Sequence, residues 1–358
     1  MVAKLLGEQK EAFSLELKGD HEAKRASYAH KKAVPLLSFE EAVARRDKLE
    51  FTPAMIQKPA QLGVHVLNDY PVTALLETID WMPFFNPWEF SGRFPDILND
   101  PIKGVEAKKL FNDAQVMLEK IIDENWLQTR AVYLLFPAYS RDNQIVILDP
   151  QSYESLETTH WLRQQKPMPD GKPQLCLADF IAPESESVRD YIGAFAVTAG
   201  HGIDVHVKRF EEAHDDYSAI MLKALADRLA ESFAEHLHRR VRTQFWGYAA
   251  YETLDNDQLI REQYRGIPPA PGYSACPDHR EKETLFRLLD VEKNTGIALT
   301  ESMAMTPTAS VSGFYFGHPD ARYFNLGKIT NDQLVAYSEA RSEPLAEAQR
   351  WLAPVLAT

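Results

Sequence analysis

One long helix restricts the fold of this chain more than any other feature of its sequence. Between residues 215 and 246, apolar residues recur at every fourth position from Tyr217 to Phe245, which predicts a continuous helix. At a rise of 1.5 Å per residue, this helix would be about 48 Å long. Ile220 and Ala224 make a second side of it apolar. A helix that is apolar on two sides is usually packed on both, so we expect this one at the centre of the molecule.

The other elements indicate a sheet. The segments 130–140 and 144–150 are joined by Arg-Asp-Asn and predict a β-hairpin. The chain does not alternate strand and helix regularly, as a doubly wound dinucleotide-binding fold does. We therefore predict an α+β fold, a single large domain with a mainly antiparallel twisted β-sheet flanked by helices. Further strands are expected at 189–200, 298–305, 310–317 and 323–329, and further helices at 105–124 and 280–296.

The first 36 residues differ from the rest in being highly charged. They predict one helix with little apolar surface to bury, and Pro35 ends it. Such a helix is typical of a connector from a preceding module, and an ordinary exposed terminal helix is the alternative. Ser38 followed by Glu41 is a capping-box pattern that predicts the start of another helix. We therefore divide the chain into a helical linker, residues 1–36, and one domain, residues 37–358.

Charge and cysteine content exclude several classes of protein. The formal charge of −13 argues against a nucleic-acid-binding protein, because neutralising phosphates requires a basic surface. Cys176 and Cys276 are the two cysteines, so we expect no disulfide framework and a cytoplasmic location. We also expect neither a secretory signal nor a membrane partner, since no apolar run approaches the roughly 18 residues of a spanning helix.

Motifs for metal or covalent chemistry are incomplete. Cys276–His279 supplies half of a zinc site without a second half. Glu235–His238 supplies one of the two Glu-x-x-His pairs of a di-iron bundle, so we expect a solvated helical face there. Asp204–Arg209 resembles the cobalamin motif D-x-H-x-x-G but ends in arginine. With no phosphate loop or activated nucleophile in the sequence, we predict no catalytic side chain and no metal ligand.

The segment 268–275, PPAPGYSA, has a backbone that its prolines hold extended. Each proline fixes its own φ and pushes the preceding residue towards an extended conformation, which predicts a short polyproline II ribbon ending at Gly272. Its carbonyls, and the amides of Ala270, Gly272 and Tyr273, suit the edge of a flat heterocycle. We interpret this segment as one that contacts a ligand, and a proline-rich surface linker is the alternative.

Long segments of the chain resemble one protein family. The stretch 266–282, GIPPAPGYSACPDHREK, resembles the signature of the C-terminal activation domain of cobalamin-dependent methionine synthase, which binds S-adenosylmethionine. The similarity covers nearly everything from about residue 37, and the linker resembles the stretch that joins the cobalamin-binding module to this domain. Other similar segments, besides the long helix, are IDWMPFF, LCLADFIAP, DYIGAFAV, LTESMAM, ASVSGFYFGHPDARYF and RWLAP.

The resemblance implies a binding site for S-adenosylmethionine. Carboxylates at Asp80 and Glu231 suit the ligand's sulfonium and ammonium groups, and tyrosine faces attract a sulfonium through the ring quadrupole. Without the resemblance, Asp80 would be read as a helix-end carboxylate and Glu231 as a solvated helical residue. The complete set of implied contacts is Asp80, Glu231, Pro268, Ala270, Gly272, Tyr273, Tyr323 and Phe324.

One position departs from the family pattern. The family has an arginine that holds the ligand's carboxylate where this chain has Pro268. Proline cannot donate a hydrogen bond, and a lost charge-assisted pair is worth roughly 1.5–3 kcal/mol. Arg265, three residues earlier, is the candidate replacement.

The resemblance also implies a function. The activation domain of methionine synthase donates a methyl group from S-adenosylmethionine for the reductive reactivation of cob(II)alamin to methylcobalamin, while flavodoxin or a similar reductase supplies an electron. The methyl acceptor is cobalt, which fits a site without a catalytic base.

In the full-length methyltransferase, separate modules bind folate, homocysteine with zinc, and cobalamin, and these modules are not in these residues. This chain is therefore not expected to make methionine alone. The basic segment 236–242 is a candidate surface for an acidic reductase, or else an ordinary solvated face. The alternative function, favoured by Pro268, is an S-adenosylmethionine-sensing or docking module without donor activity.

Overall fold

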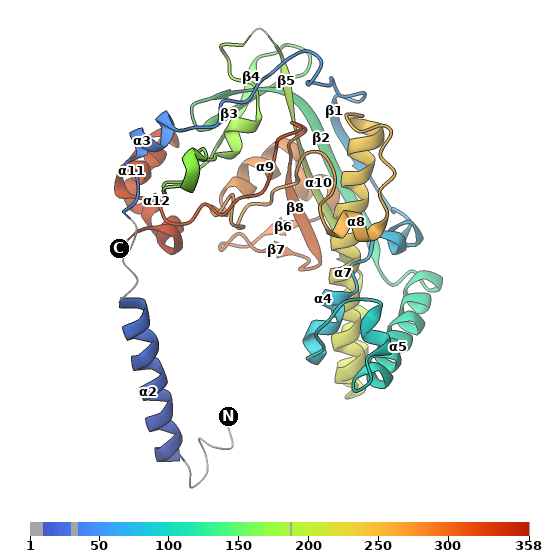
Figure 1. The fold of residues 1–358 in the computed structure, drawn as a ribbon. Coiled ribbons are helices and arrows are strands. Elements are labelled where there is room, and N and C mark those ends of the chain that lie inside the picture. Colours follow the sequence, from blue (N-terminus) through green and yellow to red (C-terminus); the bar gives the residue numbers. More distant parts are fainter. Residues whose placement is uncertain (1–9, 30–34, 187, 358) are drawn as a thin grey trace.

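The computed structural model describes residues 10–29, 35–186 and 188–357, and an antiparallel β-sheet lies at its centre (Figure 1). Within these residues the sheet has six strands in the order β4-β3-β2-β5-β8, and β1 also pairs with β2. All of these pairings are antiparallel. The strands are β1 Gly63–Leu67, β2 Gln128–Arg141, β3 Gln144–Leu148, β4 Ser155–His160, β5 Asp190–His201 and β8 Ser310–Tyr315, with a separate hairpin of β6 Ala298–Leu299 and β7 Met305–Thr306.

The predicted hairpin is formed by β2 and β3. Arg141 pairs with Gln144, so Asp142 and Asn143 make a two-residue turn. Asp142 has a positive φ of 54°, as tight hairpin turns require, and aspartate tolerates this conformation better than most residues. The short polar turn therefore sets the register of the two strands.

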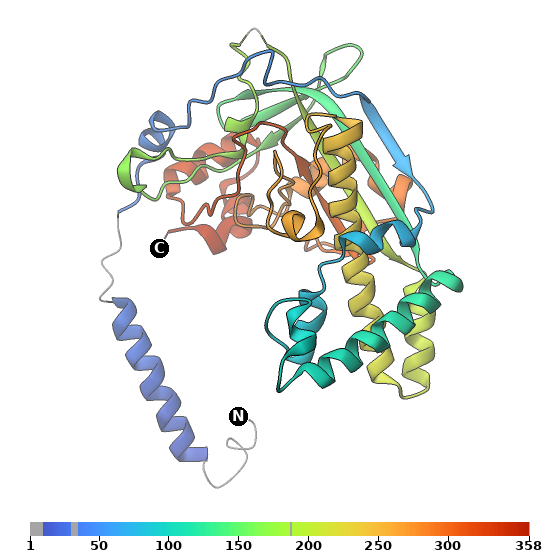
Figure 2. The same ribbon diagram turned by 45° about the vertical axis from the view of Figure 1, so that its right-hand side comes forward.

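Strand β5 is buried on both faces because a layer of helices covers each side of the sheet. Phe195 and Val197 point into one core, and the alternating residues Ala194 and Ala196 point into the other. The first core contains the apolar residues of α5 and α7, and the second contains those of α9 and α10. The two ribbon views show α7 running across the sheet with α5 beside its far end (Figures 1 and 2).

The long helix α7, Asp216–Arg240, is central and packed on two sides, as predicted. Its first turn is capped by Asp215, whose side chain accepts a hydrogen bond from the Ser218 amide over 3.0 Å. A π-helical turn, Val241–Phe245, continues the helix to the predicted end. One side of α7 contacts β5 and β8, and other sides contact α5 and α6.

The remaining helices lie around this framework. Helices α11 and α12 form a small core of their own with Leu162, Leu326 and Ile329. No described helix is long and apolar enough to cross a membrane. The helices are α2 Lys10–Ala29, α3 Phe39–Ala44, α4 Met82–Phe85, α5 Gly104–Asp123, α6 Ile203–Glu212, α8 Asn256–Ile260, α9 Glu281–Leu289, α10 Val291–Thr295, α11 Asn331–Ala340 and α12 Leu345–Leu352.

The fold class is confirmed, and three local predictions are wrong. The predicted strand at 298–305 is instead the hairpin of β6 and β7, because the chain turns at Met303, which has a φ of 62° and donates its amide to the carbonyl of Thr300 over 2.9 Å. The predicted helix at 280–296 is divided into α9 and α10 because Asp290 adopts a left-handed conformation, with φ of 47°. The predicted strand at 323–329 is irregular and adds no ladder to the sheet. Of the predicted lead helix, α2 is described, whereas residues 1–9 and 30–34 lie outside the described residues.

Candidate functional site

A cavity of about 780 Å³ opens between α7 and the proline-rich segment. Its walls come from distant parts of the chain: the region of Asp80, one side of α7, residues 259–264, the proline-rich segment and residues 323–325. Phe195 on β5 and Val311 on β8 add apolar surface from the sheet. This volume lies within the 300–1,000 Å³ that is typical of small-molecule sites.

The proline-rich segment is held against strand β8 by backbone hydrogen bonds. Ile267 and Phe316 exchange two N–H···O bonds of 3.0 Å, and the amide of Phe314 donates to the carbonyl of Pro269 over 2.9 Å. Gly313 lies at the closest approach, where a Cβ would be 2.8 Å from the carbonyl oxygen of Pro269. The absence of a side chain at Gly313 therefore lets the ribbon lie directly on the strand, with its other side open to the cavity.

A tight turn follows the ribbon. Gly272 has a φ of 100°, and its amide donates to the carbonyl of Cys276 over 2.7 Å. The amide of Cys276 in turn donates to the carbonyl of Tyr273 over 3.0 Å. A Cβ at Gly272 would lie 2.2 Å from Cε1 of His279, so the turn has no room for a side chain. The turn projects Tyr273, which is 69% exposed, beside the cavity.

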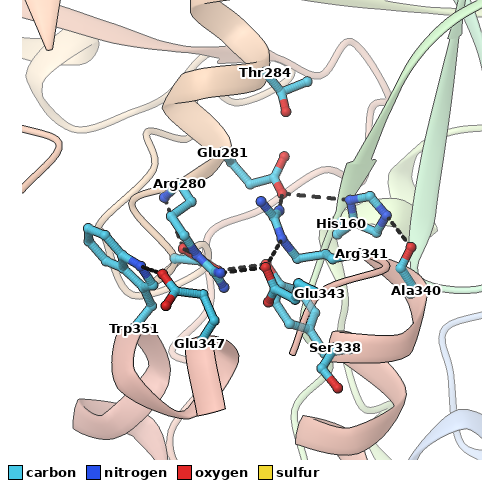
Figure 3. A network of polar contacts seen from close by, with 12 residues as sticks. His160, Arg280, Glu281, Thr284, Ser338, Ala340, Arg341, Glu343, Glu347 and Trp351 are labelled. Carbon is cyan, nitrogen blue, oxygen red and sulfur yellow. Dashed lines mark hydrogen bonds and ion pairs between the residues drawn. The ribbon is translucent and has the colours of Figure 1, made fainter. Parts of the chain in front are cut away.

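Beyond the turn, a buried network of charges ties the segment to the C-terminal helices (Figure 3). Asp278 accepts hydrogen bonds from Arg280 Nη2 over 2.6 Å and from the Tyr337 hydroxyl over 2.9 Å. Arg280 also donates to Glu343 over 2.6 Å, and Arg341 pairs with the fully buried Glu281. Each charged member has a partner of opposite charge, which a buried charge requires. The network therefore fixes the chain just after the proline-rich segment against α11 and the residues that follow it.

The cavity is rich in carboxylates. Asp80, Glu231, Glu235 and Glu262 all line it, against a single cationic side chain, Arg228, among the described residues of its wall. Burial raises the pKa of Glu231, and the charge of Arg228 partly opposes this rise. Burial likewise raises the pKa of Glu262. An acidic cavity from which water is partly excluded favours a cationic ligand.

Glu235 and Tyr264 also line the cavity, and neither was predicted as a site residue. The solvated helical face expected at Glu235–His238 is wrong, because the Glu235 side chain is 22% exposed and His238 is 1% exposed. Burial raises the pKa of Glu235 to about 7, although Arg242 lies 3.5 Å away and opposes the rise. Arg242 is itself fully buried, paired with Glu252 over 2.7 Å, and stacked over the Tyr264 ring with its Cζ 4.3 Å from the ring centroid. Glu235 follows Glu231 by four residues, one helical turn, and this spacing was the signal that could have identified it.

The domain that contains this cavity matches a known family. Residues 71–342 match the family described as vitamin B12 dependent methionine synthase, activation domain. The chain belongs to this family. A crystal structure of the MetH reactivation domain bound to AdoHcy is also similar, with 47% sequence identity and a TM-score of 0.88 over 90% of this chain and 99% of that one. The resemblance in the sequence is thus confirmed, and this activation domain is part of a methyltransferase whose use of vitamin B12 implies a cobalamin module.

The activation domain brings most of the predicted contacts together. Seven of the eight predicted residues line this one cavity, and their roles towards a ligand stay predictions. Gly272 is the exception, because it forms the turn behind Tyr273 and is not part of the wall. Asp80 also accepts a hydrogen bond from the amide of Met82 over 3.1 Å, so it holds the start of α4 while it faces the cavity.

The structure bears on two predictions about basic residues of this domain. Arg265 is not part of the cavity wall, because its guanidinium donates to the carbonyls of Met55 over 2.6 Å and Gly317 over 2.9 Å. The segment 236–242 is basic at the surface only in part. His238 is 1% exposed and Arg242 fully buried, whereas Arg239 and Arg240 are half-buried and line a separate cavity. A role of this segment as a surface for a reductase stays a prediction.

The two thiols lie in apolar surroundings. Cys176 and Cys276 are free and buried. Burial raises the pKa of Cys176 to about 12 and that of Cys276 well above its ordinary value, so neither is a ready thiolate. Among the residues that the structure describes, no group of three or more His, Cys, Asp or Glu side chains is arranged to hold a metal ion.

Proposed function

We propose that this activation domain binds S-adenosylmethionine in the cavity and donates its methyl group for the reductive reactivation of cobalamin. The observation that carries the proposal is the convergence of Asp80, Glu231, Tyr273 and Tyr323 on one acidic cavity. The similar crystallised domain is bound to AdoHcy, which is the compound that remains when S-adenosylmethionine has lost its methyl group.

Each chemical group of S-adenosylmethionine has a suitable counterpart in the wall. The sulfonium and ammonium would be stabilised by the carboxylates of Asp80 and Glu231, and the rings of Tyr273 and Tyr323 would offer electron-rich faces. The adenine would meet backbone carbonyls of the stretch 268–270 and the amide of Ala270, since the two prolines have no N–H. These contacts bind and orient the donor, which is what an intramolecular-like transfer needs from the protein.

The methyl transfer itself requires no catalytic side chain from this domain. Cobalamin, bound by its own module, would supply a reduced cobalt as the acceptor of the methyl group, and the electron pair of the broken carbon–sulfur bond would stay on sulfur. No proton moves, so no general base is required. The carboxylates must hold a sulfonium without overstabilising it, because the positive charge on sulfur is already reduced in the transition state and is lost when transfer is complete.

Calorimetry on the full chain tests binding. We expect saturable binding of S-adenosylmethionine, weakened about tenfold or more by Asp80→Asn or Glu231→Gln through loss of a charge-assisted contact. S-adenosylhomocysteine should be affected less, because its sulfur is neutral. Asp216→Asn is the matched control, since Asp216 is an exposed acid on the same helix outside the cavity wall. Absence of heat with both ligands, or an equal loss in the control, contradicts the proposal.

A transfer assay distinguishes a methyl donor from a sensing or docking module. Pro268, at the position of the family arginine, favours the sensing or docking module. The domain is mixed with the cobalamin module, a chemical reductant and S-adenosylmethionine labelled in its methyl group. Arrival of the label on cobalt supports donation, and binding without transfer supports the sensing or docking function.

The same proposal implies which modules and partner proteins would act together with this domain. Residues 1–36 would be the linker from the cobalamin-binding module, and zinc would belong to another module of the same cytoplasmic enzyme. Flavodoxin or a similar reductase would supply the electron. The present chain, 37–358 in particular, would act as the methyl-donating domain and would not make methionine alone.

A further inference from the structure

The charges around the cavity are strongly unbalanced. Four carboxylates line it, and Arg228 is the one cationic side chain that the described part of the chain contributes to the wall. Arg228 lies on α7 one turn before Glu231 and Ser232, which also line the cavity, and it is half-buried. Its charge reaches the cavity, since it opposes the burial-induced rise in the pKa of Glu231.

Arg228 also differs from Arg242 and Arg265 in having no hydrogen-bond or ion-pair partner within the described residues. Neither a hydrogen bond nor an ion pair to any of them holds its guanidinium, whereas Arg242 is paired with Glu252 and Glu235. Arg265 is likewise held by the backbone carbonyls of Met55 and Gly317. Five N–H donors at the edge of a ligand cavity are therefore free to bind a ligand group.

An amino-acid ligand brings a carboxylate into this acidic site. Beside Asp80, Glu231, Glu235 and Glu262 that carboxylate would be repelled at most positions. A planar guanidinium can bind it with two parallel hydrogen bonds and offset the repulsion. Pro268 cannot supply such a contact, and Arg265 is held elsewhere.

We propose that Arg228 binds the carboxylate of the ligand's amino-acid group and makes the cavity selective for nucleosides that carry one. This inference rests on the proposed binding of S-adenosylmethionine. It divides the site by charge: the acids meet the sulfonium and ammonium, and Arg228 meets the carboxylate.

The test compares two ligands that differ in the carboxylate alone. S-adenosylmethionine and its decarboxylated analogue are titrated by calorimetry into the wild-type chain, Arg228→Gln and Arg228→Lys. We expect Arg228→Gln to weaken S-adenosylmethionine about tenfold or more, and Arg228→Lys to weaken it less. The analogue should bind Arg228→Gln as tightly as wild type or more tightly, because the variant removes a positive charge near a cationic ligand.

Arg239→Gln is the matched control, because Arg239 lies on the same helix outside the cavity wall. It should leave both ligands unchanged, and circular dichroism of each variant reports whether the fold is intact. Equal loss of both ligands in Arg228→Gln, or loss of neither, overturns the assignment of Arg228 while the proposed function stands. If the wild-type chain binds neither ligand, the proposed function fails and this inference fails with it.

Discussion

Gly272 forms a turn that leaves no space for a side chain. The substitution Gly272→Ala therefore tests whether this turn of the proline-rich segment requires glycine. A Cβ there would lie 2.2 Å from Cε1 and 2.6 Å from Nδ1 of His279. The residue also has a φ of 100°, which L-amino acids other than glycine rarely adopt. Alanine therefore meets two separate penalties, one from the backbone and one from the imidazole ring.

The size of the combined effect can be estimated. A non-glycine residue with left-handed backbone costs about 1–2 kcal/mol. Overpacking costs about 1–3 kcal/mol, and the lower end applies because His279 is exposed and can turn away from Lys282, its neighbour at 3.3 Å. Alanine also reduces the conformational entropy of the unfolded chain, which stabilises the folded state by about 0.4–1 kcal/mol. We expect a net loss of about 2 kcal/mol in the free energy of unfolding.

Urea unfolding of four proteins measures both penalties. These are the wild type, Gly272→Ala, His279→Ala and the double variant. In the His279→Ala background the alanine should cost about 1 kcal/mol, because the ring is gone and the backbone strain is left. An equal cost in both backgrounds would show that the ring is no obstacle. A loss below about 0.5 kcal/mol for Gly272→Ala alone, the range of ordinary surface substitutions, would refute the reasoning about the turn.

Two further predictions concern buried charges. Because the pKa of Glu235 is raised from 4.5 to about 7, the folded state binds the extra proton between these values, and wild-type stability should fall as pH rises through that window. Glu235→Gln should flatten this dependence and gain about 3 kcal/mol of unfolding free energy relative to the wild type between pH 4 and pH 8, measured by urea unfolding. Parallel profiles of the two proteins would contradict the assignment. Asp179→Ala leaves Arg163, which is 1% exposed, without its 2.6 Å partner and should cost about 3–5 kcal/mol of unfolding free energy. The control Glu184→Ala breaks a pair that is 52% exposed and should cost less than about 1 kcal/mol, and similar losses in both would refute the distinction.

The elements with a strong local signal were predictable. The four-residue repeat from Tyr217 to Phe245 predicted a long central helix, and the structure has α7 with a π-helical turn over the same residues. The short polar connection Arg-Asp-Asn at 141–143 predicted the β2–β3 hairpin, and the structure places the turn at residues 142 and 143. In both cases the periodicity or turn chemistry of neighbouring residues decides the backbone, and tertiary packing reinforces it.

Segments with a weak local signal were not predictable in the same way. The stretch 323–329 has the composition of a strand, yet it finds no partner in the sheet and packs by Leu326 and Ile329 against α11 and α12. Asp290 interrupts a helical pattern because it adopts a left-handed backbone that its side chain tolerates. Strand formation depends on a partner elsewhere in the chain, which local composition does not reveal.

For the site, the amino-acid pattern identified the kinds of residue that are needed: a proline-stiffened ribbon, acids at Asp80 and Glu231, and tyrosines. Tertiary packing alone decided which charges are available. Packing holds Arg265 on backbone carbonyls and buries Arg242 beside Glu252. Among the described residues it gives Arg228, in the cavity wall, neither a hydrogen bond nor an ion pair. Backbone preference is a property of adjacent residues, whereas the partner of a long charged side chain is set by whatever distant segment folds beside it.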